Sequence, residues 1–176
     1  EILFGLVIGV ILGSLTALML VTSKLWQSIL KPILLFSQAL PVFAIAPVLT
    51  LWLGYGIISK IVMAILIIYF PVTSAFFDGL NQTSKEYLDL ARVLKGKKFR
   101  ILLFIKIPHA LPSLFSGIRL AAVYAPIGAT IGEWVGSSDG LGYLMLLANG
   151  RVKTELLFAS LLTLGLMSVS LYGITN

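Results

Sequence analysis

Long runs without a charged side chain limit this sequence to a membrane fold. Residues 2–23 carry no charge, and residues 32–59 form a second uncharged run. A helix needs about 20 largely apolar residues, at about 1.5 Å each, to cross about 30 Å of hydrocarbon. Residues 61–77, 107–132 and 156–176 supply three further apolar runs. The sequence therefore predicts an all-α polytopic membrane protein with five transmembrane helices.

Composition and charge exclude most other classes of protein. Charged residues make up 11% of the chain, against about 25% in a soluble domain. Nine of the 20 charges lie in residues 85–106, and the mean hydropathy is +1.04. We therefore attribute the net charge of +6 to membrane topology and expect no nucleic-acid partner. The sequence contains no cysteine, which excludes disulfides and thiolate metal sites.

The positions of lysine and arginine between the spans predict the orientation. If residues 85–106 are cytoplasmic, alternation places the connector 24–31 on the same side and Lys60, Arg151 and Lys153 on the other. Nine positive residues then lie inside and three outside, in agreement with the positive-inside rule. The first residue falls outside in this arrangement, so we expect six spans in the intact chain.

Small residues recur every four positions along the first span, at Gly5, Gly9, Gly13 and Ala17. Such a face lets another helix approach closely in lipid, where no hydrophobic force drives helices together. The pattern therefore predicts a helix-packing surface. Packing within the subunit and packing against a second subunit both remain open.

Residues 84–107 are predicted to form a helix-turn-helix that projects from the membrane. Thr83 and Glu86 fit a capping box, which favours a helix start. Gly96 suits a left-handed helix end, and a second helix is expected over 97–107. The first helix carries an apolar stripe at positions i, i+3, i+4 and i+7, namely Tyr87, Leu90, Ala91 and Leu94.

The stripe of this segment is narrow, and the acids Glu86 and Asp89 lie among the basic residues. This mixture favours a surface that contacts another protein. An amphipathic helix lying on anionic headgroups is the alternative.

Parts of this segment resemble the cytoplasmic signature of binding-protein-dependent ABC importer permeases, E-A-A-x3-G-x9-I-x-L-P. Lys95 occupies the glycine place of that signature, and Gly96 follows one residue late, so the turn departs from the family pattern. The residues that carry the resemblance are Asp89, Leu90, Ala91, Lys95, Gly96, Ile105, Ile107 and Pro108.

The resemblance extends over nearly the whole chain. Residues 38–41 (QALP) and 131–136 (IGEWVG) look like the subgroup that serves nitrate, alkanesulfonates, taurine and pyrimidine precursors of thiamine. Residues 42–47 and 124–128 are most similar to the hydroxymethylpyrimidine permeases of that subgroup. A thiamine precursor is therefore the expected cargo, with sulfonate, taurine or nitrate as the alternatives.

The resemblance implies the membrane-spanning permease subunit of an ABC importer, with residues 1–176 as one transmembrane domain. Its implied partners are two cytoplasmic ATP-binding subunits, an external or periplasmic solute-binding protein and a second permease copy. ATP hydrolysis is expected on the partner subunit, so the chain itself is not an enzyme. The implied location is multi-pass in the bacterial cytoplasmic (inner) membrane. The signature residues of segment 84–107 would contact the ATP-binding subunit.

Four residues within or beside the spans are candidates for the translocation pathway or for contact with the binding protein: Gln38, Arg119, Pro126 and Glu133. A proline frees a backbone carbonyl and bends a helix, which is tolerated in membranes where a cavity or neighbouring helix satisfies it. Kinked packing is the alternative for the proline. The alternatives for Arg119 and Glu133 are snorkelling and anchoring at the interface.

No motif for catalysis or cofactor binding is visible. Residues 95–98 (KGKK) lack the earlier glycine and the following hydroxyl residue of a Walker loop. His109 is the sole histidine and has no metal-ligand spacing around it. We therefore expect no cofactor and no metal. An ion-coupled secondary transporter and a membrane scaffold without transport remain the competing functions.

Overall fold

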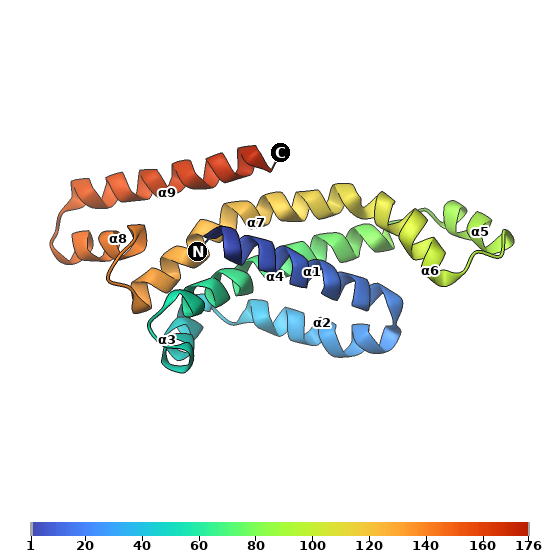
Figure 1. The fold of residues 1–176 in the computed structure, drawn as a ribbon, viewed down its shortest axis with the longest axis horizontal. Coiled ribbons are helices and arrows are strands. Elements are labelled where there is room, and N and C mark those ends of the chain that lie inside the picture. Colours follow the sequence, from blue (N-terminus) through green and yellow to red (C-terminus); the bar gives the residue numbers. More distant parts are fainter. Residues whose placement is uncertain (1, 176) are drawn as a thin grey trace.

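The computed structural model describes residues 2–175, which form a bundle of helices (Figure 1). A π-helical turn, η1 (Leu102–Lys106), joins α6 directly to α7. Within the described residues the α-helices are α1 (Ile2–Thr22), α2 (Lys24–Ala39), α3 (Val42–Leu53), α4 (Ile57–Asn81), α5 (Lys85–Val93), α6 (Lys98–Ile101), α7 (Ile107–Gly136), α8 (Leu141–Gly150) and α9 (Thr154–Ile174).

Among residues 2–175, four helices are long and apolar enough to cross a membrane: α1, α4, the continuous helix Lys98–Gly136 and α9. The bent pair formed by α2 and α3 raises the number to five when it is counted as one span. The predicted all-α polytopic architecture is therefore confirmed.

The second apolar run, residues 32–59, differs from the expected single span with a turn. Residues 24–31, expected as a connector, are already helical, because Ser23 caps α2 and accepts a hydrogen bond from the Leu25 N–H at 3.2 Å. Pro41 then ends this helix, since it has no N–H and restricts the residue before it. The helix α3 leaves at 100° to α2. The run therefore contributes to two helices, α2 and α3, that are separated by a sharp bend.

The arrangement of the helix ends follows the predicted alternation (Figure 1). The α1–α2 turn and the α5–α6 segment lie at one end of the molecule, and the α3–α4, α7–α8 and α8–α9 connections lie at the other. The basic segment thus shares its end with the α1–α2 turn. This grouping is the one that the lysine and arginine positions predict.

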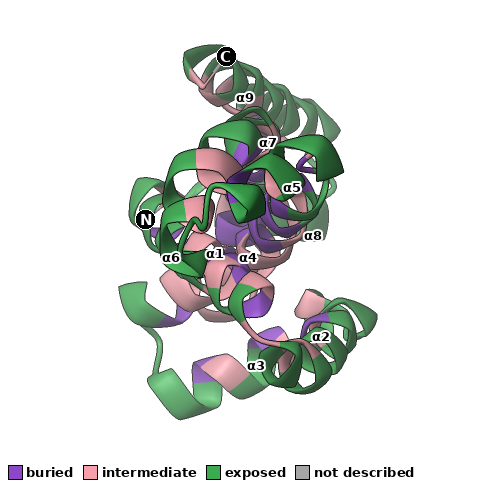
Figure 2. Ribbon diagram, turned by 90° about the vertical axis from the view of Figure 1, so that its right-hand side faces the viewer, coloured by how far each residue is buried: buried purple, intermediate pink, exposed green. Residues whose placement is uncertain are grey.

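Helix α4 lies at the centre of the bundle, between α1 and α7 (Figure 2). A Cβ atom added to Gly5 would lie 2.8 Å from the Ala64 Cβ, and one added to Gly128 would lie 2.8 Å from the Ala64 Cα. Both glycines are therefore required for the close approach of their helices to α4. The whole small-residue face of α1 packs against α4 within the chain, through Gly5, Gly9, Gly13 and Ala17.

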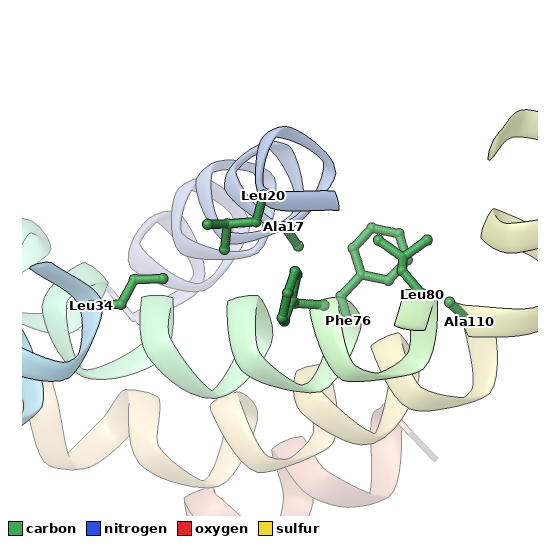
Figure 3. Close-up of a cluster of buried hydrophobic side chains, with 7 residues drawn as sticks. Ala17, Leu20, Leu34, Phe76, Leu80 and Ala110 are labelled. Carbon is green, nitrogen blue, oxygen red and sulfur yellow. The ribbon is translucent and has the colours of Figure 1, made fainter. Parts of the chain in front are cut away.

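A cluster of buried side chains joins four helices near the α5–α6 end (Figure 3). Leu20 of α1, Leu34 of α2, Phe76 and Leu80 of α4 and Ala110 of α7 belong to it. In lipid the stabilisation from such a cluster comes from van der Waals packing, because the surrounding tails are equally apolar. The cluster therefore holds the ends of α1, α4 and α7 together where the basic segment begins.

The outward faces of the long helices are apolar. Along α9, Phe158, Leu162, Leu166 and Val169 are 60% to 68% exposed. Exposed apolar patches of this extent are rare on soluble monomers. The hydrocarbon core of a bilayer is therefore the solvent that fits this surface.

Candidate functional site

Residues 84–107, which contain α5, α6 and η1, are called the hairpin below. Between α5 and α6 the chain turns through a Schellman helix end at Lys95. The Lys95 N–H donates to the Arg92 carbonyl and the Gly96 N–H donates to the Ala91 carbonyl, each at 2.9 Å. The left-handed residue, expected at Gly96, is Lys95, with φ of +55°. It therefore sits at the glycine place of the resembled signature. Gly96 supplies space instead, because an added Cβ would lie 2.9 Å from the Ala91 carbonyl oxygen.

The capping box expected at the start of the hairpin is not formed. Ser84 is the N-cap residue of α5 and makes no side-chain cap hydrogen bond. The Thr83 hydroxyl donates to the Leu80 carbonyl of α4 at 3.3 Å, so it belongs to the end of the preceding helix. Glu86 lies in the first turn of α5, where the helix dipole favours an acid.

The hairpin exposes most of its predicted apolar stripe. Tyr87 and Leu90 are each 59% exposed, and Leu94 is 73% exposed. Phe99 of α6 adds a further apolar ring that is 72% exposed. These four residues are called the apolar face below. Ala91, expected on the same surface, is only 8% exposed and packs inside the hairpin, and its contact with the ATP-binding subunit stays a prediction.

The signature acid Asp89 lies on the exposed side of α5. Its carboxylate accepts a hydrogen bond from Arg92 at 2.8 Å, and both side chains are more than 60% exposed. An exposed pair of this kind contributes little to stability. Asp89 is therefore available to a partner protein.

The second half of the hairpin is continuous with the membrane helix. A separate helix that ends before Pro108 was expected, but the chain is helical without interruption over Lys98–Gly136. A proline ring clashes with the carbonyl four residues earlier in a regular helix. The π-helical turn accommodates Pro108, and the Ile107 N–H donates to the Leu102 carbonyl across it. Ile105 and Ile107 are half-buried in this turn.

A cavity of about 600 Å³ lies where the α2–α3 break meets α4 and α7, and is called the break cavity below. Gln38 and Pro41 line it from the break, Ser74 and Asp78 from α4, and Tyr124 from α7. The Ser74 hydroxyl donates to the Asp78 carboxylate at 3.4 Å. Of the four candidate pathway residues, Gln38 lines this cavity.

Glu133 lies near the end of α7 that is remote from the hairpin, and it makes a hydrogen bond there. Its carboxylate accepts a hydrogen bond from the Gly142 N–H at 2.6 Å, in the first turn of α8. A Cβ at Gly140 would overlap this carboxylate, and Gly140 has φ of +111°. The Lys60 ammonium donates to the Ser137 hydroxyl at 2.9 Å beside it. We call these contacts the outer corner.

The two remaining pathway candidates lie elsewhere on α7. The Arg119 guanidinium donates to the Ser116 hydroxyl at 3.2 Å on the same helix. Pro126 is buried, and its carbonyl accepts a hydrogen bond from the Thr130 hydroxyl at 2.8 Å. Within residues 2–175, no group of three or more His, Cys, Asp or Glu side chains is arranged to hold a metal ion.

The sequence did not predict that Ser74, Asp78 and Tyr124 line one cavity, although Tyr124 belongs to the run 124–128 that carries the resemblance. The predicted span ends at residue 77, so the i, i+4 pair of Ser74 and Asp78 lies across its limit. A polar pair within an apolar helix was the available signal. The convergence of α2, α4 and α7 on it is a property of the fold.

The fold is therefore a polytopic helical bundle whose longest helix extends into a hairpin with an exposed apolar face. A family model described as the binding-protein-dependent transport system inner membrane component matches residues 5–176, and the chain belongs to this family. It is an ABC transporter permease subunit of the binding-protein-dependent type and a multi-pass inner membrane protein.

Relatives with known names are similar over most of the chain. It is 54% identical over 172 residues to a probable ABC transporter permease protein of Haemophilus influenzae, covering 98% of this chain and 70% of the relative. It is 34% identical over 169 residues to the formylaminopyrimidine transport permease protein ThiX of Halalkalibacterium halodurans, covering 94% and 66%. It is 36% identical over 146 residues to the riboflavin transport system permease protein RibX of Chloroflexus aurantiacus, covering 83% and 54%. The chain thus spans between about half and seven tenths of these relatives.

Proposed function

We propose that this chain carries a small polar solute across the inner membrane, driven by ATP hydrolysis on a separate cytoplasmic subunit that binds the hairpin. The observation that carries the proposal is the apolar face (Tyr87, Leu90, Leu94 and Phe99), which the chain itself leaves exposed. Apolar side chains on a cytoplasmic segment gain most by burial against another protein. Asp89 and the neighbouring bases supply a polar rim to that contact.

The continuous helix Lys98–Gly136 supports a mechanical role for the hairpin. A movement of α6 acts directly on α7 because no flexible connector separates them. Helix α7 in turn packs closely on α4, since an added Cβ at Gly117 would lie 2.8 Å from the Ala75 Cβ. Closure of two ATP-binding subunits would therefore move α4 and α7 together as a rigid unit.

The break cavity is the part of the pathway that this chain contributes. Broken helices in membrane proteins line cavities, because their free backbone groups need polar partners. Gln38, Ser74 and Tyr124 offer hydrogen bonds there, beside the apolar ring of Phe70. Two permease copies would enclose the complete pathway, and an external binding protein would deliver the solute to the outer corner.

A pyrimidine of the thiamine-precursor type is the proposed cargo. Two of the relatives are named for nitrogen heteroaromatic solutes, a formylaminopyrimidine and riboflavin. Among the described residues that line the break cavity, Asp78 is the one charged side chain. An acidic, aromatic-lined cavity suits a heteroaromatic ring with amino donors, whereas a sulfonate or nitrate anion would be repelled.

Reconstitution tests this function. Proteoliposomes that contain the permease, its ATP-binding subunits and its binding protein should take up a labelled aminopyrimidine only with ATP inside the compartment that holds the ATP-binding subunits. Taurine should not compete. Uptake driven by an ion gradient without the ATP-binding subunits would contradict the proposal in favour of a secondary transporter. Partner binding without any uptake would contradict it in favour of a scaffold.

A further inference from the structure

A second cavity, of about 580 Å³, lies between the end of α1 and the hairpin. It is separate from the break cavity and shares no lining residue with it. Arg92, Lys98 and Lys106 line it together with apolar side chains that include Val21, Leu88 and Phe99. Its volume falls within the range of about 300 to 1,000 Å³ that is typical of small-ligand sites.

The charge of this cavity is positive. Arg92 is balanced by Asp89, with which it forms an ion pair at 2.8 Å. Lys98 and Lys106 form no ion pair with any residue among 2–175. No acidic side chain from the described part of the chain lines the cavity. Two ammonium groups beside an apolar wall therefore remain to be matched by an anion.

The cavity lies where the apolar part of two long helices ends. Val21 and Thr22 end the apolar helix α1, and Lys106 is the last charged residue before the apolar start of α7. Both positions belong to the end of the bundle that carries the basic hairpin (Figure 1). Anionic lipid headgroups are concentrated at the cytoplasmic surface, and basic pockets between membrane helices on that side bind them.

We propose that this cavity binds the headgroup of an anionic phospholipid from the cytoplasmic leaflet. The phosphate would lie between the ammonium groups of Lys98 and Lys106, and the glycerol and upper acyl chains would contact Val21 and Leu102. The lipid would then contact both α1 and the hairpin. The proposal concerns lipid binding alone and does not depend on the nature of the cargo.

The test uses the assembled transporter, with its ATP-binding subunits, in nanodiscs of phosphatidylcholine mixed with phosphatidylglycerol. Native mass spectrometry measures how much phosphatidylglycerol stays bound. The double variant Lys98→Gln with Lys106→Gln removes both cavity lysines. The control variant Lys95→Gln with Lys97→Gln makes the same charge change in the same hairpin, at two exposed residues that do not line the cavity.

The wild type and the control should retain phosphatidylglycerol equally. Each cavity lysine should contribute about fivefold, so the Lys98/Lys106 variant should bind roughly 25-fold more weakly. Equal binding by the two double variants would overturn the proposal. Displacement of the lipid by inorganic phosphate at comparable concentration would also overturn it, in favour of a site for a free anion. Cross-linking of a Val21→Cys variant, at the α1 wall of the cavity, to the ATP-binding subunit would show that protein fills the cavity and would overturn it as well.

The readout keeps this proposal separate from the proposed transport function. Lipid retention is measured without turnover, so a loss of ATP coupling leaves it unchanged. An inactive transporter that retains phosphatidylglycerol through Lys98 and Lys106 would still support the lipid site.

Discussion

The two ends of the long helix from Lys98 to Gly136 differ in how far this chain itself supplies contacts for their side chains. At the outer corner, Glu133 and Ser137 are satisfied by Gly142 and Lys60 of the same chain. At the hairpin, the backbone closes its own turn at Lys95, but the apolar face stays exposed. The outer corner is thus complete within one chain, whereas the hairpin leaves an apolar surface that the proposed ATP-binding subunit would cover. A change at the outer corner should therefore lower stability, whereas a change on the apolar face should lower transport.

The largest expected effect is on transport. The double variant Leu90→Glu with Leu94→Glu places two carboxylates on the apolar face, where binding of the ATP-binding subunit would desolvate them. Desolvating unpaired charges costs several kcal/mol, and about 1.4 kcal/mol corresponds to a factor of ten. ATP-driven uptake in proteoliposomes should therefore fall at least about tenfold, without a change in the melting temperature of the permease.

Two controls sharpen this prediction. Leu90→Met keeps an apolar side chain and should retain uptake. Lys85→Gln with Lys97→Gln changes the charge of the hairpin by the same amount away from the apolar face and should also retain it. Full uptake by the double Glu variant would show that the apolar face is not a docking surface.

The next effect is on stability at the outer corner. Gly140→Ala forces an alanine into φ of +111°, and its Cβ would overlap the Glu133 carboxylate. Strain of this kind costs about 1–3 kcal/mol before the displacement of the carboxylate is added. The midpoint of thermal unfolding in detergent should fall clearly. Gly150→Ala is the matched control, because no atom lies within 4 Å of its added Cβ. Equal midpoints for the two variants would contradict the outer-corner contact.

A smaller loss is expected from Glu133→Gln. The amide still accepts a hydrogen bond from the Gly142 N–H but lacks the negative charge that the N-terminus of α8 favours. The expected loss is about 1 kcal/mol in the free energy of unfolding, measured by denaturant titration. Uptake per folded molecule should stay near the wild-type value. A strong loss of uptake with unchanged stability would instead give Glu133 a role in transport.

The most local effect is a gain in stability at the turn of the hairpin. Lys95 adopts a left-handed conformation that costs a non-glycine residue about 1–2 kcal/mol. Lys95→Gly should therefore slow hydrogen exchange of the Lys95 and Gly96 amides, which close the turn. Lys97→Gly, at a residue with φ of −66°, should speed exchange instead. Faster exchange in the Lys95→Gly variant would contradict the assigned turn.

The sequence predicted most of the membrane fold because uncharged runs carry a direct physical signal. The runs at 2–23, 61–77, 107–132 and 156–176 each correspond to a helix in the structure. The run at 32–59 was harder, since hydropathy does not register a change of direction. Pro41 was visible in the sequence, but the 100° bend depends on how α3 packs against α4 and α7.

The hairpin was predicted as an element but not in its details. Thr83 has a hydroxyl that could cap α5, but in the structure this hydroxyl donates to the Leu80 carbonyl at the end of α4. Gly96 was the obvious left-handed residue by composition, yet the hydrogen-bond register of the helix end selects Lys95. The break cavity was not predictable, because Gln38, Ser74 and Tyr124 meet only through tertiary packing.

Protection of a single introduced cysteine tests the docking of the hairpin most directly. The chain has no native cysteine, so a Leu90→Cys variant reports one position on the apolar face. A membrane-impermeant maleimide should label it in inside-out vesicles, and binding of the ATP-binding subunit should block the labelling, while a Lys85→Cys control stays labelled. Labelling of Leu90→Cys from the outer side, or labelling that the ATP-binding subunit leaves unchanged, would contradict the account.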